Sequence, residues 1–225
     1  MTSTHAEPAS IAQVEVESGD LAAKIEVESK KTFARWSHAK ELLGKYYKGS
    51  VVKDGEGVAF VDHLLHQWTF RALRKNWKNS ANLITQTIIE EAEKYNFDPI
   101  FLMAVIQSES SFQPTIIGPV GEIGLMQITP DTGKWISQKF GFQWTGPKSL
   151  KDPVKNIRIG AAYMSYLRGK FEGRSQLYIA AYNMGSANVN RALARQVTPK
   201  QYPSRVLKNY VSFYNRLSKV ENTLN

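Results

Sequence analysis

The chain has 225 residues, of which 42% are hydrophobic and 11% aromatic, enough for one globular core or for one domain with an appendage. It contains no cysteine, which excludes disulfides, thiolate metal sites and cysteine nucleophiles. Its formal net charge of +9 favours an anionic partner, such as nucleic acid, a membrane surface or an acidic cell-wall polymer.

The N-terminal third of the chain divides by charge. Residues 1–30 hold six acidic residues and two lysines, and we expect them to form a flexible acidic tail or a short appended element. Residues 31–80 hold ten basic and four acidic residues. Helical patterns at 33–48 and 58–78 predict that this part is a basic helical N-terminal extension.

Two histidines stand three residues apart on the second of these helices. The spacing of His63 and His66 can place two metal ligands side by side. No further histidine or carboxylate pair accompanies them, so we favour a surface position over a metal site. The basic residues of the same helix can grip an acidic polymer or simply form its solvated face.

Residues 81–225 show helical patterns and no convincing β pattern, so the fold class is expected to be mainly α. Asp98-Pro99 and Asp152-Pro153 are typical helix starts, with the aspartate as N-cap and proline at the first helical position. Helices are predicted at 83–95, 99–110, from Thr129-Pro130, from Pro153, at 176–182 and at 203–217.

Glu109 lies near the end of the helix that Asp98 begins. It continues the apolar face formed by Leu102, Val105 and Ile106. Burying an ionised glutamate is costly, so its pKa is expected to rise. A carboxylic acid still protonated near neutral pH can serve as the general acid that cleaves a glycosidic bond.

A glycine-rich segment follows at 118–130. Its glycines at 118, 121 and 124 allow positive φ or close approach of the backbone to a ligand. Gln127 offers a donor and an acceptor suited to sugar hydroxyls or an acetamido group, and Met126 offers a soft apolar contact. The same residues can also form an ordinary turn leading into a core element.

Two later blocks present polar groups at helix ends. Tyr182 and Asn183 close the short helix at 176–182, and Gly185 is expected to cap it in the αL conformation. Tyr202 stands directly before Pro203, which opens the last helix. Each block alone also has an ordinary structural explanation. Only the order and spacing of the blocks together are specific enough to indicate a function.

Together these blocks resemble the soluble lytic transglycosylase (SLT) domain of the goose-type lysozyme superfamily, over about residues 82–220. Two departures occur at the last block, where Pro203 replaces the usual valine and Pro199-Lys200-Gln201 replaces a frequent Glu-Thr. The matching motifs are Glu-Ser-Ser-Phe-x-Pro at 109–114, Gly-x-x-Gly-Leu-Met-Gln-Ile-x-Pro at 121–130, Ala-Ala-Tyr-Met-x-Tyr-Leu at 161–167, Ala-Ala-Tyr-Asn-x-Gly at 180–185 and Tyr-x-x-x-Val-Leu-x-x-Tyr at 202–210.

The resemblance implies a lysozyme-like helical domain, at 81–225, with a glycan-binding cleft. It implies that the enzyme cleaves the β-1,4 bond between N-acetylmuramic acid and N-acetylglucosamine in peptidoglycan and leaves 1,6-anhydromuramoyl ends. Glu109 is the implied catalytic residue, and no metal or organic cofactor is implied. The implied substrate-binding residues are Ser111 and Met126 along the cleft, Gln127, Tyr182 and Asn183 around the acetamido group, and Tyr202 and Glu122.

One carboxylate can suffice if the substrate's own acetamido group and C6 hydroxyl take part, with Glu109 acting as acid and then as base. Glu122 is the rival for a second role: across the cleft, as a base for water, it would make the enzyme a hydrolytic muramidase. We favour Glu122 as a rim residue. A wall-binding module of a phage or secretion apparatus is a further alternative, and dispersed basic residues make nucleic-acid binding the least favoured.

The sequence shows no run that could span a bilayer, and its first residues lack the basic and apolar regions of a signal peptide. The chain either stays in the cytoplasm or is exported after loss of a signal. The resemblance favours the periplasm or cell envelope. We expect a monomer that binds peptidoglycan glycan strands, with residues 31–80 available to an envelope protein partner.

Overall fold

The computed structural model describes residues 11–47 and 57–224. These residues form helices without any strand, which confirms the mainly α class. Two isolated bridges join Ile123 to Ile117 and to Ile128 within one loop. The elements are α1 (Ile11–Leu43), η1 (Gly44–Tyr46), α2 (Gly57–Ala72), η2 (Lys75–Ser80), α3 (Ala81–Lys94), α4 (Pro99–Glu109), α5 (Pro130–Phe140), η3 (Pro147–Lys151), α6 (Pro153–Lys170), α7 (Ser175–Met184), α8 (Ser186–Ala194) and α9 (Gln201–Leu224).

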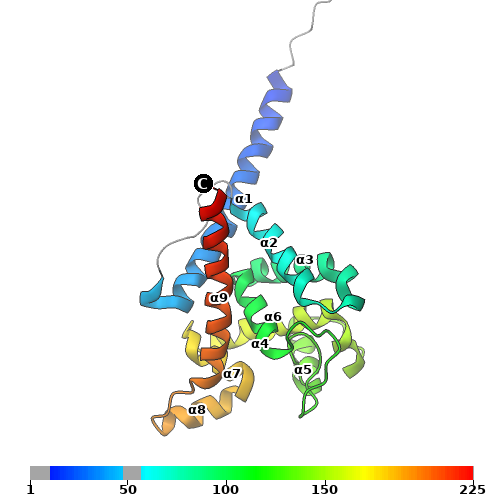
Figure 1. Ribbon diagram of the computed structural model, residues 1–225, viewed down its shortest axis with the longest axis vertical. Coiled ribbons are helices and arrows are strands. Elements are labelled where there is room, and N and C mark those ends of the chain that lie inside the picture. The colour runs from blue at the N-terminus through cyan, green and yellow to red at the C-terminus, as the bar shows by residue number, and fades with distance from the viewer. Residues whose placement is uncertain (1–10, 48–56, 225) are drawn as a thin grey trace, which may run out of the picture.

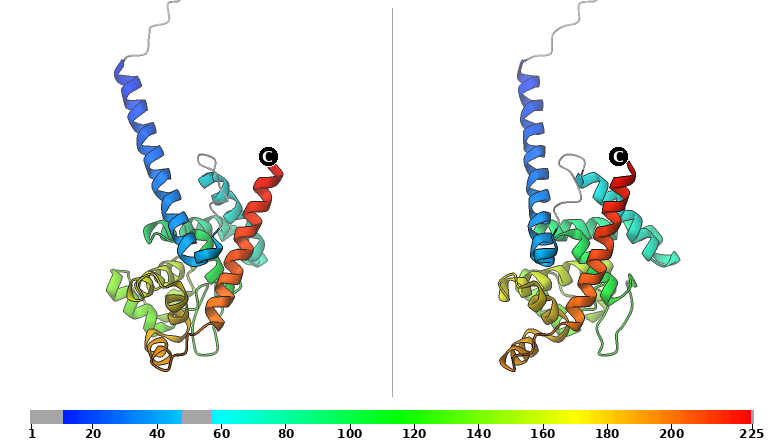
Figure 2. Two further views of the ribbon diagram at one scale, coloured as in Figure 1. Left: turned by 90° about the vertical axis from the view of Figure 1, so that its left-hand side faces the viewer. Right: turned by 60° about the vertical axis from the view of Figure 1, so that its left-hand side comes forward.

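α1 is one continuous helix that crosses the boundary predicted at residue 30. Its N-terminal part projects away from the body, and its C-terminal part packs against the body (Figures 1 and 2). Residues 11–30 lie within this helix, while residues 1–10 lie outside the described residues. Extending an existing helix costs far less than nucleating one, so the packed half supports the projecting half.

The packed end of α1 joins the same core as the later helices. His38, Ala39 and Leu42 are buried there, and Leu65 of α2 is buried in the same cluster. Glu41 accepts hydrogen bonds from Arg168 Nε of α6 at 3.1 and 3.0 Å. The described residues before 81 thus share one hydrophobic core with the residues that follow.

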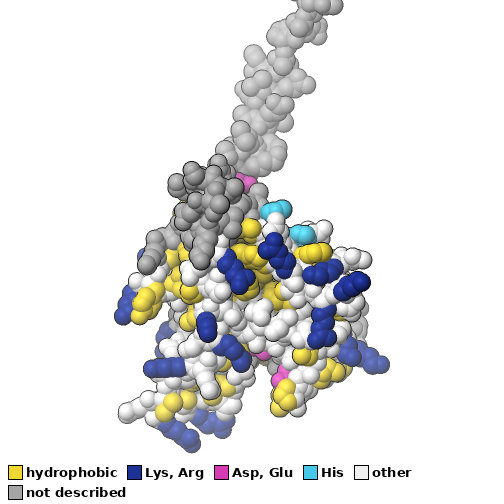
Figure 3. Space-filling model, in the orientation of Figure 1, with side chains coloured by type: hydrophobic (Ala, Val, Ile, Leu, Met, Phe, Trp, Pro, Cys, Tyr) yellow, Lys and Arg dark blue, Asp and Glu magenta, His cyan; other side chains and the backbone are white. Residues whose placement is uncertain are grey.

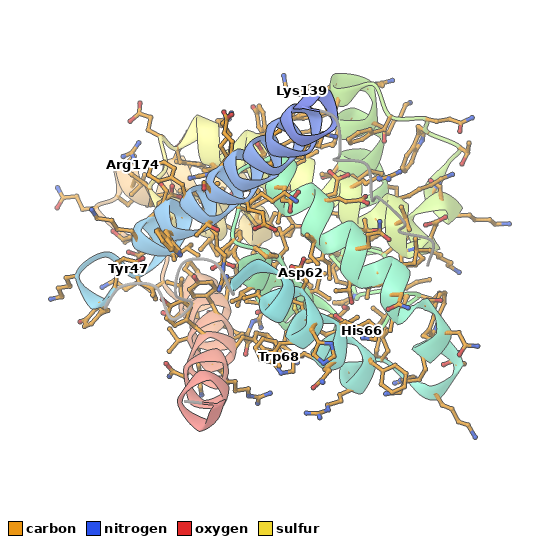
Figure 4. All side chains as sticks on the ribbon, turned by 90° about the horizontal axis from the view of Figure 1, so that it is seen from above. Tyr47, Asp62, His66, Trp68, Lys139 and Arg174 are labelled. Atoms are coloured by element: carbon orange, nitrogen blue, oxygen red, sulfur yellow. The ribbon has the colours of Figure 1, made fainter. Side chains whose placement is uncertain are left out.

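The second predicted helix, at 58–78, is split in two. α2 ends at Ala72, and the chain continues as the short helix η2. The Lys78 ammonium donates to the carbonyls of Phe70 and Arg71, two of the last carbonyls of α2. Trp68 lies between α2 and α9 (Figure 4) and stacks on Phe213 with ring centroids 5.3 Å apart.

α4 lies at the centre of the body (Figure 1) and is buried on every side. Each of its residues from Ile100 to Ile106 is fully buried, so the single apolar face predicted for this helix was too narrow. The predicted start is confirmed: Pro99 is the first helical residue, and the Asp98 carboxylate accepts from the Ile100 N–H at 3.0 Å.

Asp98 ties the start of α4 to two other helices. Tyr210 of α9 donates to Asp98 Oδ2 at 2.7 Å, and Arg35 Nε of α1 lies 3.5 Å from Oδ1. The Asp98 N–H donates to His38 Nδ1 at 3.0 Å, so the hydrogen of that neutral ring sits on Nε2, 3.0 Å from the Tyr178 hydroxyl. Burial and the charge of Arg168 lower the pKa of His38, which keeps the ring neutral.

The starts of α5 and α6 were predicted correctly, and one later helix was missed. Thr129 and Asp152 accept hydrogen bonds from the first backbone N–H groups of α5 and α6. α8 was not predicted. The αL cap expected at Gly185 was wrong, because this residue has φ +81° and ψ +146° and joins α7 directly to α8. α9 begins two residues before Pro203, at Gln201.

Replacing Tyr210 by phenylalanine should destabilise the fold. The variant removes the hydroxyl that donates to the buried Asp98 carboxylate and offers no substitute, so we expect a loss of about 1–3 kcal/mol in the free energy of unfolding. Urea denaturation measures this. Tyr46→Phe is the matched control, because the Tyr46 side chain is exposed, and it should change stability by less than about 0.5 kcal/mol. Equal effects of the two substitutions would contradict the role assigned to Tyr210.

Candidate active site

Glu109 is the last residue of α4 and is half-buried, so its carboxylate lies at the C-terminal end of the buried helix. The chain turns sharply directly after Glu109. Ser111 and Phe112 have φ values of +49° and +58°, a backbone region that residues other than glycine rarely adopt. This turn buries the Phe112 ring completely and leaves Ser111 exposed. Ser110 Oγ donates to the Leu125 carbonyl at 2.8 Å, which joins the helix end to the glycine loop.

The surroundings of Glu109 act on its pKa in opposite directions. Burial raises the pKa of the Glu109 carboxyl and is the largest influence. A hydrogen bond from the Tyr202 hydroxyl to Oε1 and the charge of Arg205 lower it, while the charge of Glu122 raises it. The net direction is upward, which confirms the prediction made from the apolar surroundings of this residue.

Tyr202 is brought directly onto Glu109 by the first turn of α9. The ring is buried, and burial together with the charge of Glu109 raises the pKa of Tyr202 well above its usual range. The hydroxyl therefore stays protonated and acts as a donor to the carboxylate. Arg205 lies one turn further along α9, with its guanidinium 5.1 Å from the Tyr202 ring centroid. Sequence reasoning missed Arg205, although its spacing of three from Tyr202 on a helix was a usable signal.

Asn156 holds the glycine loop in place. Its Oδ1 accepts from the Met126 N–H at 2.7 Å, and its Nδ2 donates to the carbonyls of Ile123 and Leu150 at 2.8 and 2.9 Å. A Cβ at Gly124 would collide with this amide, and Gly124 also has φ +84°, so both space and conformation require glycine there. Asn156 was missed as well. It was visible as one polar residue beside Ile157 on the buried face of the helix that Pro153 begins.

The side chains of Met126 and Gln127 both make contacts within the protein. The Met126 side chain is fully buried against Gly160, where a Cβ would collide with its sulfur, and this placement does not support the predicted contact along the cleft. Gln127 Nε2 donates to the Gly124 carbonyl at 2.9 Å and to the Ile116 carbonyl at 3.4 Å. The amide hydrogens of Gln127 are therefore bonded within the loop and do not point toward a ligand.

Tyr182 and Asn183 differ although they are adjacent. Tyr182 is buried, and its hydroxyl donates to the Met126 carbonyl at 2.9 Å, so it supports the loop from α7. The charge of Glu109 contributes to raising the pKa of Tyr182, which places the ring within electrostatic range of that carboxylate. Asn183 is exposed at the end of α7. These positions make Tyr182 a supporting residue and leave Asn183 accessible to a ligand.

Glu122 lies on the glycine loop and is half-buried. Its Oε2 accepts from the Val120 N–H at 2.9 Å, two residues earlier, and its side chain fills the space where Gly118 would otherwise carry a Cβ. Its charge reaches Glu109, as the effect on the pKa shows. Figure 3 shows a hollow in the lower edge of the molecule with acidic side chains on its wall, on the side where the loop lies in Figure 1.

The histidine pair on α2 lies apart from this site. His63 is exposed, and its Nε2 lies 2.7 Å from the Gln67 amide nitrogen. Among the described residues no three His, Cys, Asp or Glu side chains are grouped as a metal site would require. The helices of residues 11–47 and 57–224 include none with the length and hydropathy to cross a membrane.

Comparisons with known proteins identify a matching family model and similar sequences. The family model of the transglycosylase SLT domain matches residues 86–204. The membrane-bound lytic murein transglycosylase C of Edwardsiella ictaluri is 27% identical over 211 residues, which cover 84% of this chain and 58% of that protein. The soluble lytic murein transglycosylase of Salmonella typhimurium is 37% identical over 90 residues, 40% of this chain and 14% of that protein.

A solved structure is also similar. It is that of an inactive mutant of the lytic transglycosylase Slt from Pseudomonas aeruginosa, in which glutamine replaces a glutamate. The TM-score is 0.54 at 27% identity, over 72% of this chain and 30% of that chain. This chain spans less than two thirds of the length of each of these proteins.

Glu109→Gln should stabilise the fold at neutral pH. The folded state raises the pKa of Glu109, so below the unfolded pKa both states are protonated and the two proteins should be equally stable. As the pH rises through the folded pKa, ionisation in a partly buried site costs the wild type stability that the neutral glutamine does not lose. Thermal unfolding of both proteins between pH 4 and pH 8 measures the difference. A glutamine variant less stable than the wild type at pH 8 would contradict this account.

Proposed function

This chain belongs to the transglycosylase SLT domain family, and we propose that it is a peptidoglycan lytic transglycosylase in which Glu109 alone serves as general acid and then as base. The observation that carries the proposal is the environment of Glu109. It is a half-buried carboxyl with a raised pKa, at the end of a buried helix, with the Tyr202 hydroxyl donating to it. A general acid needs such a raised pKa to remain protonated near neutral pH.

The proposed reaction uses no water. Glu109 donates its proton to the glycosidic oxygen as the bond between that oxygen and C1 of N-acetylmuramic acid breaks. The acetamido group of the same sugar stabilises C1 as an oxazolinium-like species. The C6 hydroxyl then attacks C1, its proton returns to Glu109, and the product carries a 1,6-anhydro ring. The carboxyl is thereby restored for the next cycle.

Tyr202 and Arg205 support the second half of this cycle. Once Glu109 has given up its proton, its carboxylate lies beside a hydroxyl donor and a positive charge, both of which favour the ionised form. Tyr182 and Asn156 hold the loop that borders the site. We assign the contacts with sugar to Ser111, Asn183 and the loop.

Hydrolysis is the second candidate, and Glu122 is the residue on which it depends. A hydrolase needs a second carboxylate to activate water. Glu122 is close enough to raise the pKa of Glu109, but its carboxylate already accepts a hydrogen bond from Val120 within its own loop. This internal use favours a rim position and supports transfer to the C6 hydroxyl.

The substrate class sets the expected location. Peptidoglycan lies in the cell envelope, so we propose that the protein acts there on glycan strands, as a monomer. The predicted division into a tail at 1–30, a basic extension at 31–80 and a catalytic part at 81–225 remains a proposal. We retain residues 31–80 as the proposed contact with an envelope partner, since their exposed basic side chains include Lys40 and Lys45.

The product distinguishes the two candidates. Digestion of purified sacculi followed by mass spectrometry should give fragments with 1,6-anhydromuramoyl ends, because no water enters the reaction. Glu109→Gln should lower turnover by at least about 100-fold, since it removes both proton transfers. Reducing ends without anhydro ends would overturn the transglycosylase proposal, and full activity of the variant would overturn the role of Glu109.

The pH profile tests the groups around Glu109. The alkaline limb of kcat/KM reports loss of the protonated acid, so it should follow the pKa of Glu109. Tyr202→Phe and Arg205→Gln each remove an influence that lowers this pKa, and should move the limb to higher pH. Glu122→Gln removes an influence that raises it, and should move the limb to lower pH.

The opposite signs serve as internal controls for this experiment. A general loss of structure would lower activity at every pH without moving the limb. Movement of all three variants in the same direction would show that another group controls the alkaline limb.

A further inference from the structure

One stretch of the surface combines positive charge with exposed apolar side chains. It comprises the end of α2, η2 and the first turn of α3, and we call it the basic–apolar tip. No aspartate or glutamate occurs between residues 63 and 89. The side chains that form the tip are Phe70, Arg71, Arg74, Lys75, Lys78 and Leu83.

The apolar members of the tip are exposed to solvent. Phe70 is 45% exposed and Leu83 is 54% exposed. They flank a segment whose other apolar side chains are used by the core: Leu73 is buried, and Trp77 packs against the core cluster. Phe70 and Leu83 are therefore available to an apolar phase outside the protein.

Three of the four cations of the tip have no acidic partner within the described part of the chain. Arg71, Arg74 and Lys75 are exposed, and none of them forms an ion pair with another described side chain. Lys78 is used locally, because it donates to the last carbonyls of α2, and its ammonium lies 4.5 Å from the Phe70 ring centroid. The tip thus presents three exposed cations together with two exposed apolar side chains.

The tip is placed so that a flat surface can reach it. The right-hand view of Figure 2 shows α2 and the segment that follows it projecting sideways from the body. In Figure 3, Lys and Arg side chains gather over the α2–α3 side of the molecule, next to hydrophobic ones. The hollow associated with the candidate active site lies at the lower edge of the same view, away from this cluster.

We propose that the basic–apolar tip docks the protein on the surface of a bilayer containing anionic phospholipids. The arginines and Lys75 would contact the lipid phosphates, while Phe70 and Leu83 enter the boundary between headgroups and acyl chains. An anionic wall polymer would satisfy the cations but offers no apolar phase for Leu83. One face of the Phe70 ring is covered by Lys78, so stacking of a sugar on that face is also blocked.

Vesicle binding by the full chain tests the charges. The protein should sediment with vesicles of phosphatidylcholine and phosphatidylglycerol, release at high salt, and bind poorly to phosphatidylcholine alone. Joint substitution of Arg71→Gln, Arg74→Gln and Lys75→Gln should weaken binding at least about 10-fold. The matched control replaces three exposed lysines elsewhere, Lys134→Gln, Lys148→Gln and Lys151→Gln, with the same change of net charge. Equal losses in the two triple variants, or no binding by the wild type, would overturn the proposal.

A second variant separates lipid insertion from simple adhesion to anions. Phe70→Ser with Leu83→Ser should weaken vesicle binding at unchanged charge, and circular dichroism would check that the fold is retained. Unchanged binding of this double variant would show adhesion to any anionic polymer and would also overturn the proposal. Binding is measured without glycan, so the outcome does not depend on the proposed enzymatic activity.

Discussion

The burial of α4 is the constraint on which the rest of the structure depends. A helix with no solvent-facing side must satisfy polar groups at both ends inside the protein. Here each end carries a carboxylate, Asp98 before the first turn and Glu109 at the last residue. Each carboxylate accepts a hydrogen bond from a tyrosine hydroxyl of α9, from Tyr210 at one end and from Tyr202 at the other. The last helix of the chain therefore completes the element that carries the candidate catalytic residue.

The two carboxylates show how environment separates structural from chemical roles. Asp98 is fully buried and is surrounded by donors, with Tyr210, the Ile100 N–H and Arg35 all acting on its carboxylate. Its pKa is raised by burial, yet its oxygens are committed to holding helices together. Glu109 is only half-buried and has a single hydroxyl donor among the described side chains, which leaves it open to a ligand.

Sequence reasoning succeeded where a local signal decides the structure. The caps at Asp98, Thr129 and Asp152 are short-range hydrogen bonds, and an acidic residue in apolar surroundings is enough to predict a raised pKa. It did not reveal hydrogen bonds between a side chain and a partner outside the local pattern. Gln127 was predicted to bind sugar, and the structure shows in addition that its amide nitrogen donates to a carbonyl of its own loop. Asn156 drew no prediction from the sequence, but it holds a loop 30 residues earlier in the chain.

The balance of influences around Glu109 has an energetic consequence for the proposed cycle, in which this residue releases and then recovers a proton. A group that must both release and recover a proton works fastest when neither its protonated nor its ionised form is strongly favoured over the other. Burial and Glu122 favour the neutral form, whereas Tyr202 and Arg205 favour the ionised form. Strongly favouring either form of Glu109 would speed one proton transfer and slow the other. Tyr202, Arg205 and Glu122 are therefore constrained jointly, and a substitution at one of them can be offset by a compensating substitution at another.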